Sequence, residues 1–254
     1  MIGRSVLVYE SKQALIDAVA ERFVAKVGEL LAEQDRVHVV LTGGSVGIAA
    51  LAAVRELDSS ALDWSRVVIW WGDERWVPAA DADRNALQAT EALLAHIPLD
   101  PANVHPFPAS DQGIELDVAA ASYAEELAAA AEPGESLPRF DITFLGVGPD
   151  GHIASLFPDY PGIQVVDATV VPVVDSPKPP PSRLSLTLST INSSARVWLV
   201  VAGADKAAAL GLALAGASQL EVPVAGVEGK YRTVYFVDAE AAAEVPDELI
   251  AAEY

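Results

Sequence analysis

Residues 38–51 read HVVLTGGSVGIAAL, and this one stretch combines an apolar run, a glycine-rich corner and the start of a helical pattern. The run VVL at 39–41 is typical of a buried strand, and helix-forming residues follow the corner TGGS at 42–45. Glycines let the backbone approach a ligand closely, and a helix N-terminus presents unpaired N–H groups with partial positive charge. The stretch therefore predicts a strand that turns directly into a helix, with a backbone suited to holding a phosphate.

The same alternation of short apolar runs and longer helical patterns continues along the chain. Strands that are apolar on both faces and separated by helices are typical of a parallel sheet covered by helices on both faces. The sequence of 254 residues shows no repeat and no clean linker, so we expect a single Rossmann-like α/β domain over 1–254. Strands are expected at 5–9, 37–41, 66–71, 141–145, 196–202 and 233–237, and helices near 11–33, 47–57, 84–95, 117–131 and 203–215.

The composition limits the partners that the chain is expected to have. Its 36 acidic and 16 basic residues give a formal charge of -20, which repels nucleic acids and anionic membranes. It has no cysteine, and therefore no disulfide, thiolate metal site or cysteine nucleophile. The start MIGRSVLVYESKQ lacks the apolar segment of a signal peptide, and no apolar stretch approaches the roughly 20 residues that span a bilayer. We expect a cytoplasmic protein without nucleic-acid or membrane partners, and a monomer, although the sequence does not determine the oligomeric state.

Among the four histidines, His152 is the strongest candidate for chemistry. It lies in the glycine-rich segment GVGPDGHIASLFPD, directly after a predicted strand, and ligands of open α/β sheets bind beyond the carboxyl ends of the strands. Asp150 lies two residues earlier, close enough to orient an imidazole ring in a turn. The other three histidines are weaker candidates for a catalytic role: His38 lies within an apolar strand, His96 ends a helix, and His105 lies among prolines in NVHPFP.

Charged residues after other strands could supply the local basic pocket that an anionic ligand needs in so acidic a chain. Asp73, Glu74 and Arg75 directly follow the third predicted strand, although a solvated turn is an equal alternative. Lys206 lies in the first turn of a predicted helix, where a cation is unfavourable to the helix dipole unless an anion lies nearby. With Arg183 in SRLSLTLST it could bind a phosphate, and an ordinary surface lysine is the alternative.

The corner also matches G-x-S-x-G through Gly43, Ser45 and Gly47, which is the pattern of a hydrolase nucleophile elbow. Asp73 and His152 would complete a triad in the order Ser–Asp–His. However, the corner follows only the second strand, a long segment follows His152, and no HGGG-type segment supplies an oxyanion hole. Ser45 is better explained as part of a phosphate-binding turn or as a helix N-cap.

Five segments, in this order and spacing, resemble the 6-phosphogluconolactonase family: LTGGS, WWGDERWVP, FLGVGPDGHIASLFP, RLSLT and GADKAAAL. The resemblance covers nearly the whole chain, and GVGPDGHIASLFP is its most specific segment. It implies a Rossmann-like α/β enzyme of the oxidative pentose phosphate pathway that hydrolyses 6-phosphogluconolactone to 6-phosphogluconate, with no cofactor and no metal. The family is related in fold to glucosamine-6-phosphate deaminases and ribose-5-phosphate isomerases.

The resemblance also implies site residues. His152 would be the base that removes a proton from water, and Asp150 would orient it and support the imidazolium. Arg75 would donate to the oxyanion, and Asp73 would shape its loop or bind sugar hydroxyls. The sugar-phosphate lactone is expected to be bound by Gly43, Gly44, Ser45, Asn85, Arg183 and Lys206.

Two related functions remain as alternatives. Glucosamine-6-phosphate deaminases share Gly-x-Asp-Gly-His-Ile-Ala but continue Phe-Asn-Glu-Pro, and their glutamate helps the histidine in ring opening. This chain has SLFP at 155–158, and phenylalanine cannot ionise, which favours the lactonase. A non-catalytic sugar-phosphate sensor usually carries a DNA-binding module, for which this acidic chain has no room. Family members commonly have Ser-Asn where this chain has Arg84-Asn85, and Asn85 stays a candidate contact.

Overall fold

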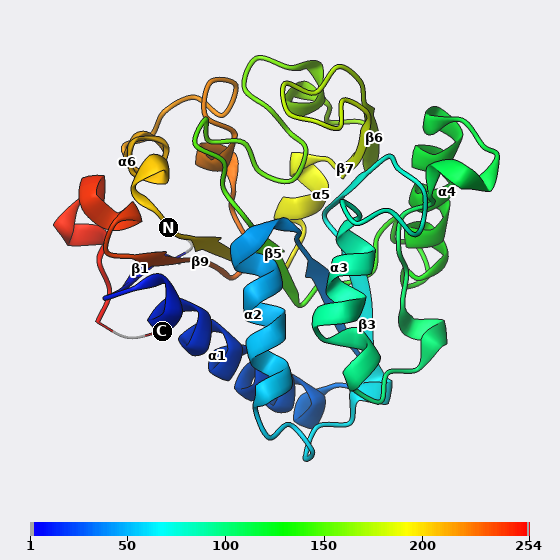
Figure 1. The fold of residues 1–254 in the computed structure, drawn as a ribbon, viewed down its shortest axis with the longest axis horizontal. Coiled ribbons are helices and arrows are strands. Elements are labelled where there is room, and N and C mark those ends of the chain that lie inside the picture. Colours follow the sequence, from blue (N-terminus) through cyan, green and yellow to red (C-terminus); the bar gives the residue numbers. More distant parts are fainter. Residues whose placement is uncertain (1–2, 253) are drawn as a thin grey trace.

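The computed structural model describes residues 3–252 and 254, and a six-stranded parallel sheet forms the centre of the fold (Figure 1). The strands lie in the order β1-β9-β8-β5-β2-β3, so the first and last strands of the chain pair with each other at one edge. This is the α/β architecture that the sequence predicts. The strands are β1 (Gly3–Tyr9), β2 (Val37–Leu41), β3 (Val67–Trp71), β5 (Ile142–Leu145), β8 (Arg196–Val201) and β9 (Arg232–Asp238).

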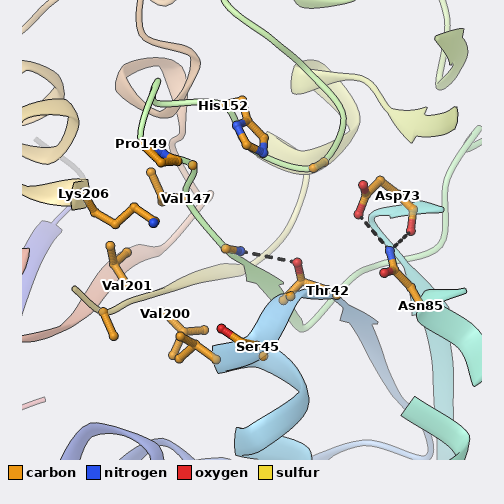
Figure 2. Close-up of a pocket in the computed structure, with 18 of the residues that line it drawn as sticks. Thr42, Ser45, Asp73, Asn85, Val147, Pro149, His152, Val200, Val201 and Lys206 are labelled. Carbon is orange, nitrogen blue, oxygen red and sulfur yellow. Dashed lines mark hydrogen bonds between the residues drawn. The ribbon is translucent and has the colours of Figure 1, made fainter. Parts of the chain in front are cut away.

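The strand order reverses between β2 and β5. The chain continues from β2 to β3 on one side, whereas β5 pairs with β2 on the other side. Ligands of open α/β sheets bind at such a switch point, beyond the carboxyl ends of the strands. The loops that leave β2 and β5 are the TGGS corner and the loop that carries His152. A hydrogen bond of 3.3 Å from the Gly146 N–H to Thr42 Oγ1 joins these loops (Figure 2).

Helices flank the sheet because its strands are apolar on both faces. All five residues of β3 are buried, as expected for a strand covered on both sides. The helices α1 (Lys12–Glu33), α2 (Gly44–Glu56) and α3 (Asn85–Ala92) pack in a row (Figure 1). Within residues 3–252 and 254, no helix is long and apolar enough to cross a membrane.

The structure adds a three-stranded antiparallel sheet that the sequence analysis did not predict. Its strands are β4 (Asp73–Arg75), β7 (Arg183–Leu186) and β6 (Val170–Val173), in the order β4-β7-β6, and α4 (Leu116–Ala129) packs against β6 and β7. The charged run at 73–75, considered as a turn, is therefore a short strand. Its pairing places Arg75 directly opposite Arg183.

The predicted strands all lie within two residues of the observed bounds, whereas some helix ends differ more. The helix expected from 47 begins at Gly44, because the glycines of the corner form its N-terminal end and Gly43 is the N-cap. The helix expected over 203–215 is preceded by the 3₁₀ turn Ala204–Lys206 and is limited to α6 (Ala207–Leu214). A five-residue helix, α5 (Leu188–Asn192), was not expected.

Candidate active site

A cavity of about 290 Å³ lies beyond the carboxyl ends of β2, β5 and β8 (Figure 2). Nine of the ten sequence-predicted site residues line it, and the tenth, Asp150, contacts one of the nine. Lys12 and Lys178 also line it, and the sequence analysis did not single out either. The nine predicted residues are Gly43, Gly44, Ser45, Asp73, Arg75, Asn85, His152, Arg183 and Lys206.

His152 is held by Asp150 in an orientation that suits a base. The imidazole Nδ1 lies 2.5 Å from Asp150 Oδ1, and the ring packs on Phe157 with the ring centroids 4.7 Å apart. Burial opposes ionisation of Asp150, but its hydrogen bond to His152 and the charges of His152 and Lys178 together lower the pKa of Asp150 well below its usual range. An ionised carboxylate can only accept, so Nδ1 carries the proton and Nε2 is left free to take one.

The loop backbone is shaped to bring the imidazole close to it. The Gly148 N–H donates to the carbonyl of His152 at 2.9 Å, and the Gly151 N–H donates to the carbonyl of Gly148 at 2.9 Å. A Cβ at Gly148 would lie 1.9 Å from His152 Nδ1 and 2.5 Å from Asp150 Oδ1. Only glycine at 148 therefore lets the ring and the carboxylate take these positions.

The TGGS corner presents backbone donors to the same cavity. Helix α2 begins at Gly44 and Gly43 is its N-cap, so the alternative in which Ser45 is the N-cap is wrong. No side chain of the described residues caps this helix, and Gly44 takes a φ of +82°, which favours glycine. The first-turn N–H groups of a helix have no intrahelical partners, which leaves those of α2 for an anion.

The triad considered for a serine nucleophile does not form. Among the hydrogen bonds of the described residues, none joins Ser45 to a histidine, and His152 bonds to Asp150 instead of Asp73. A serine nucleophile needs a base within hydrogen-bond reach. This geometry gives Ser45 no activating partner.

Asp73 is buried and is fixed by two side chains, of which Figure 2 shows Asn85. Its Oδ2 accepts from Ser155 Oγ at 2.7 Å and its Oδ1 accepts from Asn85 Nδ2 at 3.3 Å. Asn85 is 1% exposed, and its Oδ1 has no hydrogen-bond partner among the described residues. A Cβ at Gly43 would lie 2.0 Å from that oxygen, so Asn85 connects β4 to the TGGS corner.

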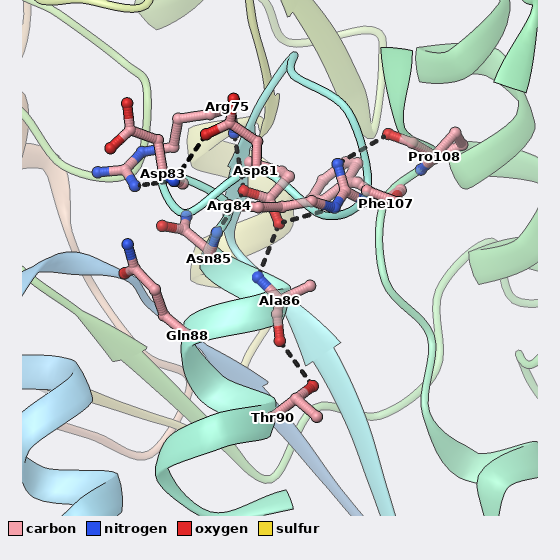
Figure 3. Close-up of polar contacts among 12 residues, drawn as sticks. Arg75, Asp81, Asp83, Arg84, Asn85, Ala86, Gln88, Thr90, Phe107 and Pro108 are labelled. Carbon is pink, nitrogen blue, oxygen red and sulfur yellow. Dashed lines mark hydrogen bonds and ion pairs between the residues drawn. The ribbon is translucent and has the colours of Figure 1, made fainter. Parts of the chain in front are cut away.

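Glu74 is not among the residues that line the cavity, and it caps the start of α3, where Asn85 and Ala86 lie (Figure 3). Its carboxylate accepts from the N–H groups of Arg75, Asn85 and Ala86 at 2.9, 2.7 and 2.9 Å. Burial raises the pKa of Glu74. The charge of Arg84 and the three N–H groups act in the opposite direction, and the Nε of Arg84 lies 3.9 Å from Glu74 Oε2. The buried Arg84 also donates to the carbonyl of Phe107, so position 84 has a structural role here.

Arg75, Arg183 and Lys206 at the cavity already have protein partners. Arg75 donates from Nη1 to the carbonyl of Asp83, and its buried Nε has no partner among the described residues. Lys206 pairs with the adjacent Asp205, which supplies the anion that a cation at a helix start requires. Burial lowers the pKa of Arg183, as does the charge of Arg75, while Asp73 opposes both.

The other three histidines lie outside the residues that line the cavity. His38 accepts at Nδ1 from Trp70 Nε1 at 3.2 Å, and burial, with the charges of Arg36 and His105, lowers the pKa of His38 to about 4. His105 Nδ1 lies 2.6 Å from Glu126 Oε1, and His96 Nε2 lies 3.1 Å from the carbonyl of Glu91. Among the described residues, no group of three or more histidine and carboxylate side chains is arranged to hold a metal ion.

Known proteins resemble this chain in both sequence and structure. Residues 10–236 match the family model of glucosamine-6-phosphate isomerases and 6-phosphogluconolactonase. The 6-phosphogluconolactonase of Streptomyces coelicolor is 45% identical over 96% of this chain and 95% of its own length. That of Mycobacterium tuberculosis is 44% identical over 96% of this chain and all of its own.

A solved structure supports the same grouping. The 6-phosphogluconolactonase of Trypanosoma brucei superposes with a TM-score of 0.84 at 27% identity, over 97% of this chain and 100% of that one. The matched region includes the TGGS corner, the DER strand and the loop that carries His152. The chain belongs to the glucosamine-6-phosphate isomerase and 6-phosphogluconolactonase family.

Proposed function

We propose that this chain hydrolyses 6-phosphogluconolactone to 6-phosphogluconate in the pentose phosphate pathway, with His152 as the general base. The observation that carries the proposal is that one cavity combines an imidazole oriented by Asp150 with a helix N-terminus suited to a phosphate. A δ-lactone is an activated ester, so its hydrolysis needs a placed water, a base and charge stabilisation at the carbonyl oxygen. The cavity supplies candidates for each.

The proposed reaction begins when His152 Nε2 removes a proton from water while the water oxygen attacks the lactone carbonyl carbon. Arg75 donates to the oxyanion that develops on the carbonyl oxygen. The tetrahedral intermediate then collapses, the bond from the carbonyl carbon to the ring oxygen breaks, and the imidazolium returns its proton to that oxygen. Asp150 supports the imidazolium and keeps its own negative charge throughout.

The 6-phosphate would lie at the other end of the substrate. We assign it to the N–H groups of Gly43, Gly44 and Ser45, with Lys206 and Arg183 as its cations. Lys206 exchanges Asp205 for the phosphate when the substrate binds. Arg183 holds the neighbouring loop with Nε and Nη2, so its Nη1 is the donor left for the ligand. The proposed partners of sugar hydroxyls are Asp73 and the Asn85 Oδ1, which has no hydrogen-bond partner in the described part of the chain.

The deaminase is the runner-up function, and the surroundings of His152 argue against it. The ring beside the imidazole is Phe157, which is buried and cannot ionise. Among the described residues, the only carboxylate hydrogen-bonded to His152 is Asp150. Within residues 3–252 and 254, no second carboxylate is hydrogen-bonded to the imidazole to assist it in ring opening.

Replacing Lys206 with alanine should weaken the binding of the phosphorylated lactone. Charge-assisted hydrogen bonds contribute roughly 1.5–3 kcal/mol, so kcat/KM is expected to fall about 10- to 150-fold, mainly through KM. The unphosphorylated lactone serves as the control, because it makes no contact with Lys206. It should be a poor substrate of the parent enzyme and should be unaffected by the substitution. Equal turnover of the two lactones by the parent enzyme would contradict the phosphate site.

Replacing Ser45 with alanine should leave substantial turnover, because the backbone of the corner and not the hydroxyl carries its role. No acyl-enzyme is expected in rapid-quench mass spectrometry of the parent enzyme. An ester trapped on Ser45 would restore the nucleophile-elbow interpretation.

We also propose that residues 1–254 act as one domain and as a cytoplasmic monomer that binds no nucleic acid. The cavity receives side chains from both sheets of one chain, which supports a site complete within a single copy. The net charge of -20 argues against nucleic-acid binding. Light scattering coupled to gel filtration, at the concentration used for activity assays, measures the oligomeric state directly.

A further inference from the structure

We propose that Lys178 is a positioning residue of the active site: its ammonium group fixes the Asp150 carboxylate and keeps the His152 imidazole in its unprotonated form. This inference rests on the proposed function in one respect, which is that His152 acts as the base. Lys178 lines the cavity from the proline-rich loop DSPKPPPSRL, five residues before Arg183 and outside the five segments on which the family resemblance rests.

The contacts of Lys178 carry the proposal. Its Nζ lies 3.4 Å from Asp150 Oδ1 and 3.2 Å from His152 Nδ1. Oδ1 is the same carboxylate oxygen that binds the imidazole. Because an ammonium group can only donate and Nδ1 carries a proton when it bonds to Asp150, the productive partner of Lys178 is the carboxylate.

The loop that carries Lys178 is held in place by Arg183. The guanidinium donates from Nη2 to the carbonyls of Lys178 and Pro179 at 3.1 and 2.9 Å, and from Nε to the carbonyl of Pro180 at 3.1 Å. The hydroxyl of Ser176 adds a bond of 2.9 Å to the carbonyl of Lys178. Lys178 therefore extends from a fixed backbone, which favours a defined position for its ammonium group.

The charges around the imidazole explain why a cation is useful here. A carboxylate that orients an imidazole also stabilises the imidazolium, which reduces the fraction of free base at a given pH. A positive charge at Asp150 offsets this effect while leaving the orienting hydrogen bond in place. Among the described residues, Asp150 and Lys178 are the charged groups that contact the imidazole. Arg183 lies over the ring of Phe157, at 5.7 Å from its centroid, and the charge of Lys178 also acts on Asp205, which pairs with Lys206.

The charges determine the direction in which loss of the Lys178 ammonium group should change the protonation of His152. Removing the ammonium group takes away a charge that repels the imidazolium and leaves the Asp150 carboxylate uncompensated. Both changes favour protonation of His152, so the pH at which the base becomes free should rise. A loop residue with a purely structural role would not move this titration.

The experiment is an NMR titration of the histidine rings in isotope-labelled protein, with the His152 signal assigned by its loss in His152→Gln. In Lys178→Met, which keeps the length of the side chain, the His152 midpoint is expected to rise by about one pH unit. Lys178→Arg, which keeps the charge, should stay near the parent value. Lys230→Met, which removes an exposed lysine elsewhere, should also leave it unchanged. In kinetics, the acidic limb of the kcat profile should shift upward in Lys178→Met by a similar amount.

An unmoved His152 midpoint in a folded Lys178→Met protein, or an equal rise in Lys178→Arg, would overturn the proposal. The titration is measured on the free protein and does not depend on turnover. A raised midpoint in a protein that fails to hydrolyse the lactone would therefore support the Lys178 contact while contradicting the proposed function.

Discussion

Replacing His152 with alanine is expected to lower kcat about 10²–10⁴-fold, which is the usual contribution of general base catalysis. KM should change little, because the phosphate is proposed to bind at the start of α2 and at Lys206. The parent rate should also rise with pH as an imidazole becomes free base, and this limb should disappear in His152→Ala. Steady-state kinetics from pH 5 to 8, corrected for spontaneous hydrolysis, measure both effects.

Asp150→Asn tests the support of the base separately from the base itself. It should lower kcat less than the loss of the imidazole does, because the base remains while its support is weakened. Parent-like turnover of His152→Ala above pH 7 would contradict the assignment of the base. Asp73 would then be the first replacement, since Glu74 is buried and already accepts three backbone hydrogen bonds.

Replacing Gly148 with alanine is expected to lower kcat by about 10²-fold or more, although position 148 carries no reactive group. The added Cβ would lie 1.9 Å from His152 Nδ1 and 2.5 Å from Asp150 Oδ1, so both side chains must move. The loss should approach that of His152→Ala, because a displaced imidazole cannot reach the attacking water. Steady-state kinetics, with circular dichroism to confirm folding, test this prediction.

Gly162→Ala provides the matched control in the same connection between β5 and β6, within the 3₁₀ turn Pro161–Gln164. There a Cβ would meet its nearest atom, Leu156 Cδ2, at 3.4 Å, which is ordinary contact. This variant should keep most of the parent activity. A folded Gly148→Ala enzyme with the parent kcat would show that the observed position of the imidazole is not the one used in catalysis.

The central sheet could be predicted from sequence because its signal is local. The run VHVVL at 37–41 and the fully buried β3 are apolar on both faces, which is the pattern of parallel strands covered by helices. The glycines after β2 and β5 mark the turns at which a ligand can approach the backbone. The same local signals located the TGGS corner and His152 with Asp150.

The small antiparallel sheet could not be predicted in the same way. Its strands have three or four residues, β4 is charged and β6 contains Pro172. Only β7, with alternating polar and apolar residues in RLSL, has the pattern of a strand, and that pattern covers four residues. They form because β7 pairs with both β4 and β6, which lie far apart in the chain. Only tertiary structure places Arg75 opposite Arg183.

The position of Lys178 at the site could not be predicted from sequence either. It is separated by 28 residues from Asp150, and its loop has the composition of an ordinary surface turn. Its position depends on Arg183, whose own placement depends on the unpredicted β7. Charged groups brought together by long-range packing leave no spacing signal in the sequence.

The most direct test of the proposed function is a lactonase assay on freshly generated 6-phosphogluconolactone, with the rate in buffer alone subtracted at each pH. The proposed mechanism predicts hydrolysis well above the spontaneous rate, with 6-phosphogluconate as the product and with the rate strongly reduced in His152→Ala. A rate with the purified parent protein that is no faster than buffer would contradict it.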